Sequence, residues 1–145
     1  MRKGFTLLEL LIVVIIVGIL ASIAIPQFLN AVEKGRVAKA KNALGLIAHA
    51  AKMYRAENDT YEELDGVESD GTGTALNDAL GNFIELTAVD KDLDWTYGIE
   101  ADVDTFTITA TKIEGATHGT ETITLNQDGV CAGTHTLKGK DCGDE

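Results

Sequence analysis

The chain is poor in the residues that usually carry catalysis. Its 145 residues include one proline, two cysteines, three histidines and two serines, and only 6% are aromatic. It has no Cys–His pair, no glycine-rich phosphate loop and no helix with metal-ligand spacing, so the enzyme classes built on those motifs are poorly supported. We therefore expect a protein that is not an enzyme and needs no cofactor.

Basic residues are scarce after residue 55. Residues 56–145 hold four Lys/Arg and 21 Asp/Glu, a net charge of 4 − 21 = −17, whereas residues 1–55 hold eight and two, a net of 8 − 2 = +6. Phosphate contacts need clustered Lys and Arg, so no nucleic-acid binding is expected of the C-terminal part. Its charge favours a solvated surface, and an acidic surface for cations or basic partners is the alternative.

A long apolar run lies near the start. Residues 10–25 carry no charge, and extended back to Phe5 the run has 21 residues. At about 1.5 Å per residue this is roughly 30 Å of helix, enough to cross a bilayer. Arg2 and Lys3 precede it, as in a secretory signal, but the run is long for a signal core and no cleavage site ends it before the polar part.

Glu9 lies inside this apolar run. A carboxylate in a membrane helix costs about 2.5–3.5 kcal/mol at the helix centre and less near its end. Glu9 is therefore either an acid tolerated at the membrane interface or an acid that meets a positive partner inside an apolar assembly.

The first thirty residues resemble a known family. A basic leader is followed by Gly4-Phe5-Thr6-Leu7-Leu8-Glu9, and the match continues through Gly18 and Pro26. This pattern is similar to the prepilin signature of type IV pilins and the related type II secretion pseudopilins.

The resemblance implies how the chain is processed. A prepilin peptidase would cut between Gly4 and Phe5 and methylate the new amine of Phe5. The α-amine, largely cationic at neutral pH, would then pair with Glu9 of a neighbouring subunit in the filament core. The resemblance also suggests that the helix between Gly18 and Pro26 loses helicity when it packs into a filament, whereas the residues alone predict a gentle kink.

The remaining pattern predicts an α+β pilin fold. A helix from Phe5 to Glu57 is expected to change at Pro26 from an apolar segment to an amphipathic one, with an inward stripe at intervals of three and four. That stripe comprises Ala40, Leu44, Ile47, Ala51 and Tyr54. The expected parts are a leader (1–4), an apolar helix (5–26), an amphipathic helix half (27–58) and an acidic head (59–145).

Period-two segments predict a small antiparallel sheet in the head. The candidates are residues 95–99, 105–111 and 122–125, with turns at 102–104 and 126–129 and a short helix at 75–80. In the clearest strand, Phe106, Ile108 and Ala110 share one face. We expect three or four strands, with one face packed on the helix stripe.

Two further features concern the head. Cys131 and Cys142 favour a disulfide over a metal half-site, because only His135 lies near them and zinc normally needs four more closely spaced ligands. A disulfide would imply an oxidising compartment. Asp90, Asp92 and Asp94 alternate, but the sixth and twelfth positions of an EF-hand loop hold Trp95 and Ala101, so only an irregular calcium site remains open.

Charge counting does not settle the orientation, because basic residues at 34–41 compete with Arg2 and Lys3 for the cytoplasmic side. The cysteines and the resemblance place the head outside.

We expect a structural subunit, held in the inner membrane as a precursor and polymerised by the pilus assembly machinery into an extracellular type IV pilus of many copies. The alternatives are a major pseudopilin of a type II secretion system and a membrane-anchored binding protein that never polymerises.

Overall fold

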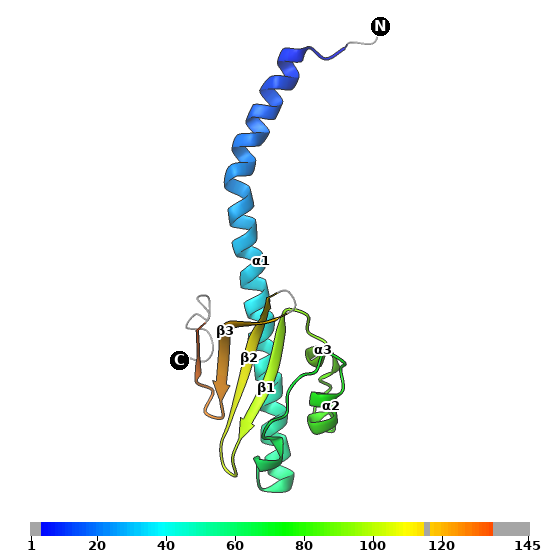
Figure 1. Cartoon of the computed structure of the whole chain (residues 1–145), viewed down its shortest axis with the longest axis vertical. Coiled ribbons are helices and arrows are strands. Elements are labelled where there is room, and N and C mark those ends of the chain that lie inside the picture. The colour runs from blue at the N-terminus through cyan, green and yellow to red at the C-terminus, as the bar shows by residue number, and fades with distance from the viewer. Residues whose placement is uncertain (1–3, 115–116, 135–145) are drawn as a thin grey trace. The chain divides into compact units, whose positions relative to one another are not determined.

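The computed structural model describes residues 4–114 and 117–134, and side chains are described outside residues 114–120. The chain divides into two compact units, residues 1–35 and 36–145. Helix α1 (Leu7–Asn58) runs through both. The second unit adds η1 (Glu62–Leu64), α2 (Ala75–Leu80), α3 (Thr87–Asp90) and strands β1 (Trp95–Ala101), β2 (Phe106–Glu114), β3 (Thr117–Asn126) and β4 (Cys131–Gly133) (Figure 1).

The four strands form one antiparallel sheet in the order β1-β2-β3-β4. Tyr97 of β1 stands opposite Ala110 of β2, and Ala110 stands opposite Ile123 of β3. These neighbours alternate with threonines, so the pleat puts apolar side chains on one face and hydroxyls on the other. The predicted α+β fold, a long N-terminal helix with a small antiparallel sheet, is confirmed.

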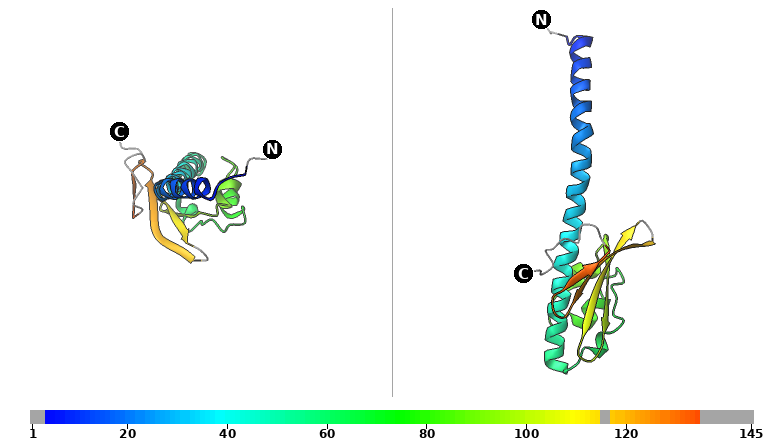
Figure 2. Two further views of the ribbon diagram at one scale, coloured as in Figure 1. Left: turned by 90° about the horizontal axis from the view of Figure 1, so that it is seen from above. Right: turned by 90° about the vertical axis from the view of Figure 1, so that its left-hand side faces the viewer.

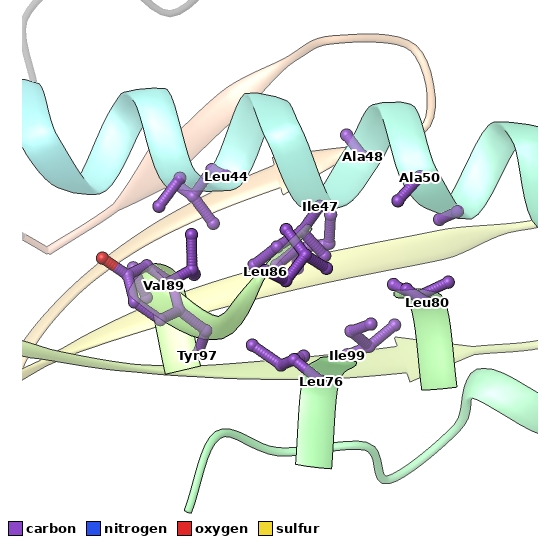
Figure 3. Close-up of a cluster of buried hydrophobic side chains, with 14 of the residues drawn as sticks. Leu44, Ile47, Ala48, Ala50, Leu76, Leu80, Leu86, Val89, Tyr97 and Ile99 are labelled. Carbon is purple, nitrogen blue, oxygen red and sulfur yellow. The ribbon is translucent and has the colours of Figure 1, made fainter. Parts of the chain in front are cut away.

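In the second unit α1 lies along the apolar face of the sheet (Figure 2). Its inward stripe has the predicted spacing: Ala40, Leu44, Ile47 and Ala51 are fully buried and Tyr54 is partly buried. Figure 3 shows Leu44, Ile47 and Ala50 facing the side chains that project from β1 and α2. The apolar stripe of the helix and the apolar face of the strands therefore pack into one core.

The end of α1 has a local cause. Asp59 adopts φ of 61°, a left-handed conformation that stops a helix, and its amide donates to the Arg55 carbonyl at 2.8 Å. The Asn58 amide side chain donates to the Tyr54 carbonyl at 2.9 Å. The helix therefore ends at Asn58, as the Asn-Asp-Thr sequence predicted.

Three short elements escaped prediction: η1, α3 and β4, of three or four residues each. An irregular segment at residues 65–69 also hydrogen-bonds to the outer edge of β1. Gly66 N donates to Ile99 O at 2.9 Å, and Ser69 N donates to Tyr97 O at 2.7 Å. The segment thus covers an edge that would otherwise expose unpaired backbone groups.

Truncation of Ile108, which is fully buried on β2, tests the core. We expect Ile108→Ala to lower the free energy of unfolding by about 2–5 kcal/mol, because it removes apolar contacts and leaves a cavity. Thermal unfolding of the full chain in detergent, followed by circular dichroism, measures the loss. Val103→Ala, in an exposed turn, is the control and should change stability by less than about 0.5 kcal/mol. Equal losses would contradict the proposed core.

Candidate functional site

The N-terminal end of α1 is held by Thr6 and Glu9. The Thr6 amide and hydroxyl both donate to Oε2 of Glu9, at 2.9 and 2.8 Å, and the Glu9 amide donates to Oγ1 of Thr6 at 3.2 Å. This reciprocal arrangement is a capping box, in which the side chains at the N-cap and third helical positions satisfy each other's backbone amides.

The capping role of Glu9 was not part of the sequence prediction, which treated this residue as an acid in an apolar run. The signal was present as Thr6-x-x-Glu9 before an apolar segment. Gly4 and Phe5, the predicted cleavage and methylation residues, are exposed just before this cap. The cap lies after the predicted cut, so it would survive cleavage.

The described part of the first unit consists of the segment leading into α1 and the first half of that helix, and its apolar residues face outward on all sides. Large apolar side chains from Leu7 to Leu29 are about half to nine-tenths exposed, and the helix is long and apolar enough to cross a membrane. Water does not stabilise a helix that is apolar all round. This segment therefore needs lipid or other apolar helices around it.

Gly18 and Pro26 lie within this exposed stretch, and α1 continues through both. A Cβ at Gly18 would meet no atom within 4 Å, so nothing in the described chain requires a glycine there. Glycine in a helix interior costs about 1 kcal/mol relative to alanine. Near Pro26, the Ser22 hydroxyl donates to the Ile19 carbonyl at 2.7 Å.

The remaining predicted site residues lie in the second unit. Cys131 begins β4 and pairs in register with Leu125 of β3. Its predicted partner, Cys142, lies outside the described residues, so the disulfide stays a prediction.

The alternating aspartates do not converge on one point. Asp90 accepts hydrogen bonds from the amides of Asp70 and Leu76, both at 3.1 Å. Asp92 and Asp94 instead contact cations of α1: Lys39 Nζ lies 2.7 Å from Asp92 Oδ1, and Arg36 Nε lies 3.2 Å from Asp94 Oδ1. Within residues 4–114 and 117–134, no three acidic, histidine or cysteine side chains are grouped to hold a metal. The arrangement gives no support to a calcium site in this loop.

Asp92 is the centre of a polar cluster beneath the start of β1. Its side chain is almost fully buried and accepts from Lys39, from the Tyr97 hydroxyl at 2.8 Å and from the Asp94 amide at 2.9 Å. Burial, followed by the hydrogen bond to Asp92, raises the pKa of Tyr97 well above its ordinary value. Tyr97 therefore keeps its proton and donates to the carboxylate.

Comparison with known proteins shows what this chain is similar to. Residues 1–25 match the family model described as the prokaryotic N-terminal methylation motif. The type II secretion system core protein G of Pseudomonas aeruginosa is 40% identical over 60 residues, which are 41% of this chain and 42% of that protein. The type IV major pilin protein PilA of Myxococcus xanthus is 44% identical over 62 residues, 43% of this chain and 28% of that protein.

A third relative is the type IV major fimbrial protein FimA of Dichelobacter nodosus, 40% identical over 63 residues, 43% of this chain and 39% of that protein. The chain spans less than half the length of these curated relatives. No solved structure gives a significant match. The resemblance to type IV pilins and to the related type II secretion pseudopilins is thus confirmed.

Two substitutions in one turn test the Asp92 cluster. Asp92→Ala should lower the free energy of unfolding by about 1–3 kcal/mol, because it leaves the buried Tyr97 hydroxyl without its acceptor. Asp94→Ala removes two partly exposed ion pairs, with Arg36 and Lys39, and should cost at most about 1 kcal/mol. Chemical denaturation of the full chain in detergent compares them, and a larger loss for Asp94→Ala would disprove the central role of Asp92.

Proposed function

We propose that this protein is a structural subunit of a type IV pilus. It is held in the inner membrane as a precursor, cut between Gly4 and Phe5 by a prepilin peptidase, methylated at Phe5 and polymerised through α1. The observation that carries the proposal is the first part of α1, up to Leu29, which is apolar, exposed on all sides, opens with the methylation motif and contains one acid, Glu9.

Lipid alone accounts for the apolar surface but not for the charge of Glu9. The capping box uses Oε2 for both hydrogen bonds from Thr6. A neutral glutamine could make the same reciprocal cap, so the cap does not require a negative charge. The methylated amine of Phe5 in a neighbouring copy is the cation that we propose compensates this charge in the filament core.

The other predicted site residues support the same function. Gly18 and Pro26 weaken the helix where no contact in the described chain requires them. We propose that they let the segment adjust when it packs among copies of itself. The Cys131–Cys142 disulfide, which would close a twelve-residue loop and contribute about 3 kcal/mol, completes the proposed extracellular head.

The second candidate is a major pseudopilin of a type II secretion system. It is favoured by the similarity to core protein G of Pseudomonas aeruginosa, which is as high as the similarity to FimA. Electron microscopy of sheared surface material discriminates the two. Abundant filaments made of this chain support the pilus, whereas loss of protein secretion on gene deletion, without surface filaments, supports the pseudopilin.

Three substitutions separate the charge of Glu9 from its cap. Glu9→Gln keeps the cap and loses the charge, Thr6→Ala keeps the charge and loses half of the cap, and Glu9→Val loses both. If the charge pairs with Phe5 of a neighbour, Glu9→Gln and Glu9→Val both reduce filament yield severely, while Thr6→Ala reduces it less. The yield of sheared filaments, normalised to membrane-bound precursor, measures the effect. Normal yield from Glu9→Gln would refute the pairing.

Processing is tested at Gly4. Substitution by a bulky residue such as Gly4→Leu should leave uncut precursor, because the proposed cleavage follows a residue without a side chain. Intact mass spectrometry of membrane and filament fractions measures the terminus, and the unaltered chain serves as control. Filaments that begin at Met1 or Arg2 would contradict the proposed cleavage.

A further inference from the structure

In the second unit, the side of α1 that points away from the sheet has few charges. Its exposed residues recur at intervals of three and four, opposite the buried stripe. They are Asn42, Gly45, Leu46, His49, Lys52, Met53 and Ala56, and we call them the outer helix face. Lys52 is the only lysine, arginine or acid among them, whereas the outer side of a surface helix is normally rich in charge. Leu46 and Met53 are 44% and 39% exposed.

Gly45 lies near the middle of the outer helix face. A Cβ there would meet no atom within 4 Å, so no contact with the described residues requires a glycine. Glycine weakens a helix relative to alanine, but it lets another surface approach the helix backbone closely. Together with the exposed Leu46 and Met53, this residue favours a face that a partner covers.

The charge of this part of α1 indicates what kind of partner it fits. Residues 36–56 hold five cations and no acid, whereas residues 57–145 hold four cations and 21 acids. Three of the five helix cations, Arg36, Lys39 and Arg55, pair with aspartates of the head. Lys52 is exposed and has no ion pair within the part of the chain that the structure describes. An acidic surface would complement it.

An acidic groove of about 570 Å³ lies on the other side of the sheet, between β1, β2 and segment 65–69. Thr109 lines it and points away from α1, because the adjacent Ala110 is buried in the core that α1 covers. The carboxylates of the groove belong to Asp65, Glu68 and Glu100, and none of its described lining residues is a cation.

The groove offers acceptors that suit a lysine. Glu68 and Glu100 are exposed, and a Cβ at Gly98 would lie 3.5 Å from Cγ of Glu68, so this side chain extends over the glycine. The hydroxyls of Ser69 and Thr96 also line the groove. Carboxylate and hydroxyl oxygens accept hydrogen bonds from the three N–H groups of an ammonium.

The outer helix face and the acidic groove belong to the same unit but cannot meet within one copy. The sheet separates them, since α1 covers one face of the sheet and the groove opens on the other. A contact between two different surfaces of identical molecules is heterologous, and it continues from copy to copy as a ring or a filament. Complementary surfaces on opposite sides of one unit therefore suit a polymer better than a closed pair.

We propose that the outer helix face of one copy docks on the acidic groove of a neighbouring copy, with the Lys52 ammonium on Glu68 and Glu100. The inference rests on the proposed function, in which copies polymerise. It adds to the contacts of the apolar segment a specific contact that is made by the second unit alone.

Exchange of the two charges tests the contact. Lys52→Glu and Glu68→Lys each bring like charges together, so each should lower the yield of sheared filaments several-fold, normalised to membrane-bound precursor. Lys52→Glu combined with Glu68→Lys restores opposite charges and should return the yield to within about two-fold of the unaltered chain. Lys52→Glu combined with Asp78→Lys is the control. It has the same net charge, but Asp78 is exposed on α2 and does not line the groove, so the yield should stay low.

Cross-linking of filaments made by the unaltered chain locates the contact. A carbodiimide joins an amine directly to a carboxylate, and mass spectrometry should find Lys52 joined to Glu68 or Glu100. A rescue no better than that of the control pair would overturn the proposal, as would filaments in which Lys52 is joined only to other carboxylates. A Glu68 joined to a lysine of a different protein would also overturn it, because another partner would then occupy the groove. Each of these results is obtained on assembled filaments, so it would leave the proposed pilus function standing.

Discussion

The packing of α1 against the apolar face of the sheet is the interaction on which the second unit depends. The buried positions on the helix between Val37 and Ala51 are mostly alanine, with Leu44 and Ile47 as the large exceptions. The bulk comes from the opposite side, where Trp95, Tyr97 and Phe106 are almost fully buried. Small residues on the helix and large ones on the strands let the two backbones approach while the interior stays filled. Alanine also favours the helix itself, so local preference and packing agree.

The same helix meets two different environments. Up to Leu29 its large apolar residues are exposed on every side, whereas from Val37 to Ala51 most apolar residues form one buried stripe, although Leu46 stays partly exposed. The near-neutral mean hydropathy of +0.05 averages these parts with an acidic head. Burial of apolar area is favourable for both parts. The stripe is buried against the sheet of the same chain, whereas the first segment is not covered by other described residues. This difference explains why one continuous helix belongs to two compact units.

The sequence predicted the elements whose signal is local and repeated. The period-two pattern located the three longer strands, although each extends beyond its predicted range, and the helix predicted at residues 75–80 has the predicted bounds. Helix α3 and strand β4 are too short to show a period, and segment 65–69 pairs with β1 mainly through its backbone, which has no sequence signature. The Asp92 cluster joins residues 53 positions apart, so no local pattern could reveal that Lys39 and Arg36 pair with aspartates the sequence analysis had weighed as calcium ligands.

The N-terminal site shows why a residue's place in a pattern does not fix a single role. The reciprocal cap satisfies the amides of Thr6 and Glu9, which in an apolar environment would otherwise be costly unpaired donors. An acid among leucines is thus explained within one chain as far as hydrogen bonding is concerned. Glutamine could make the same reciprocal cap without a charge to desolvate, whereas the carboxylate makes stronger hydrogen bonds and interacts favourably with the helix dipole. We propose that a cation within reach of this carboxylate in an apolar surrounding gives a reason for the charge beyond the cap. Within the described residues the carboxylate of Glu9 accepts hydrogen bonds from Thr6, so the proposed cation is best sought on a second molecule.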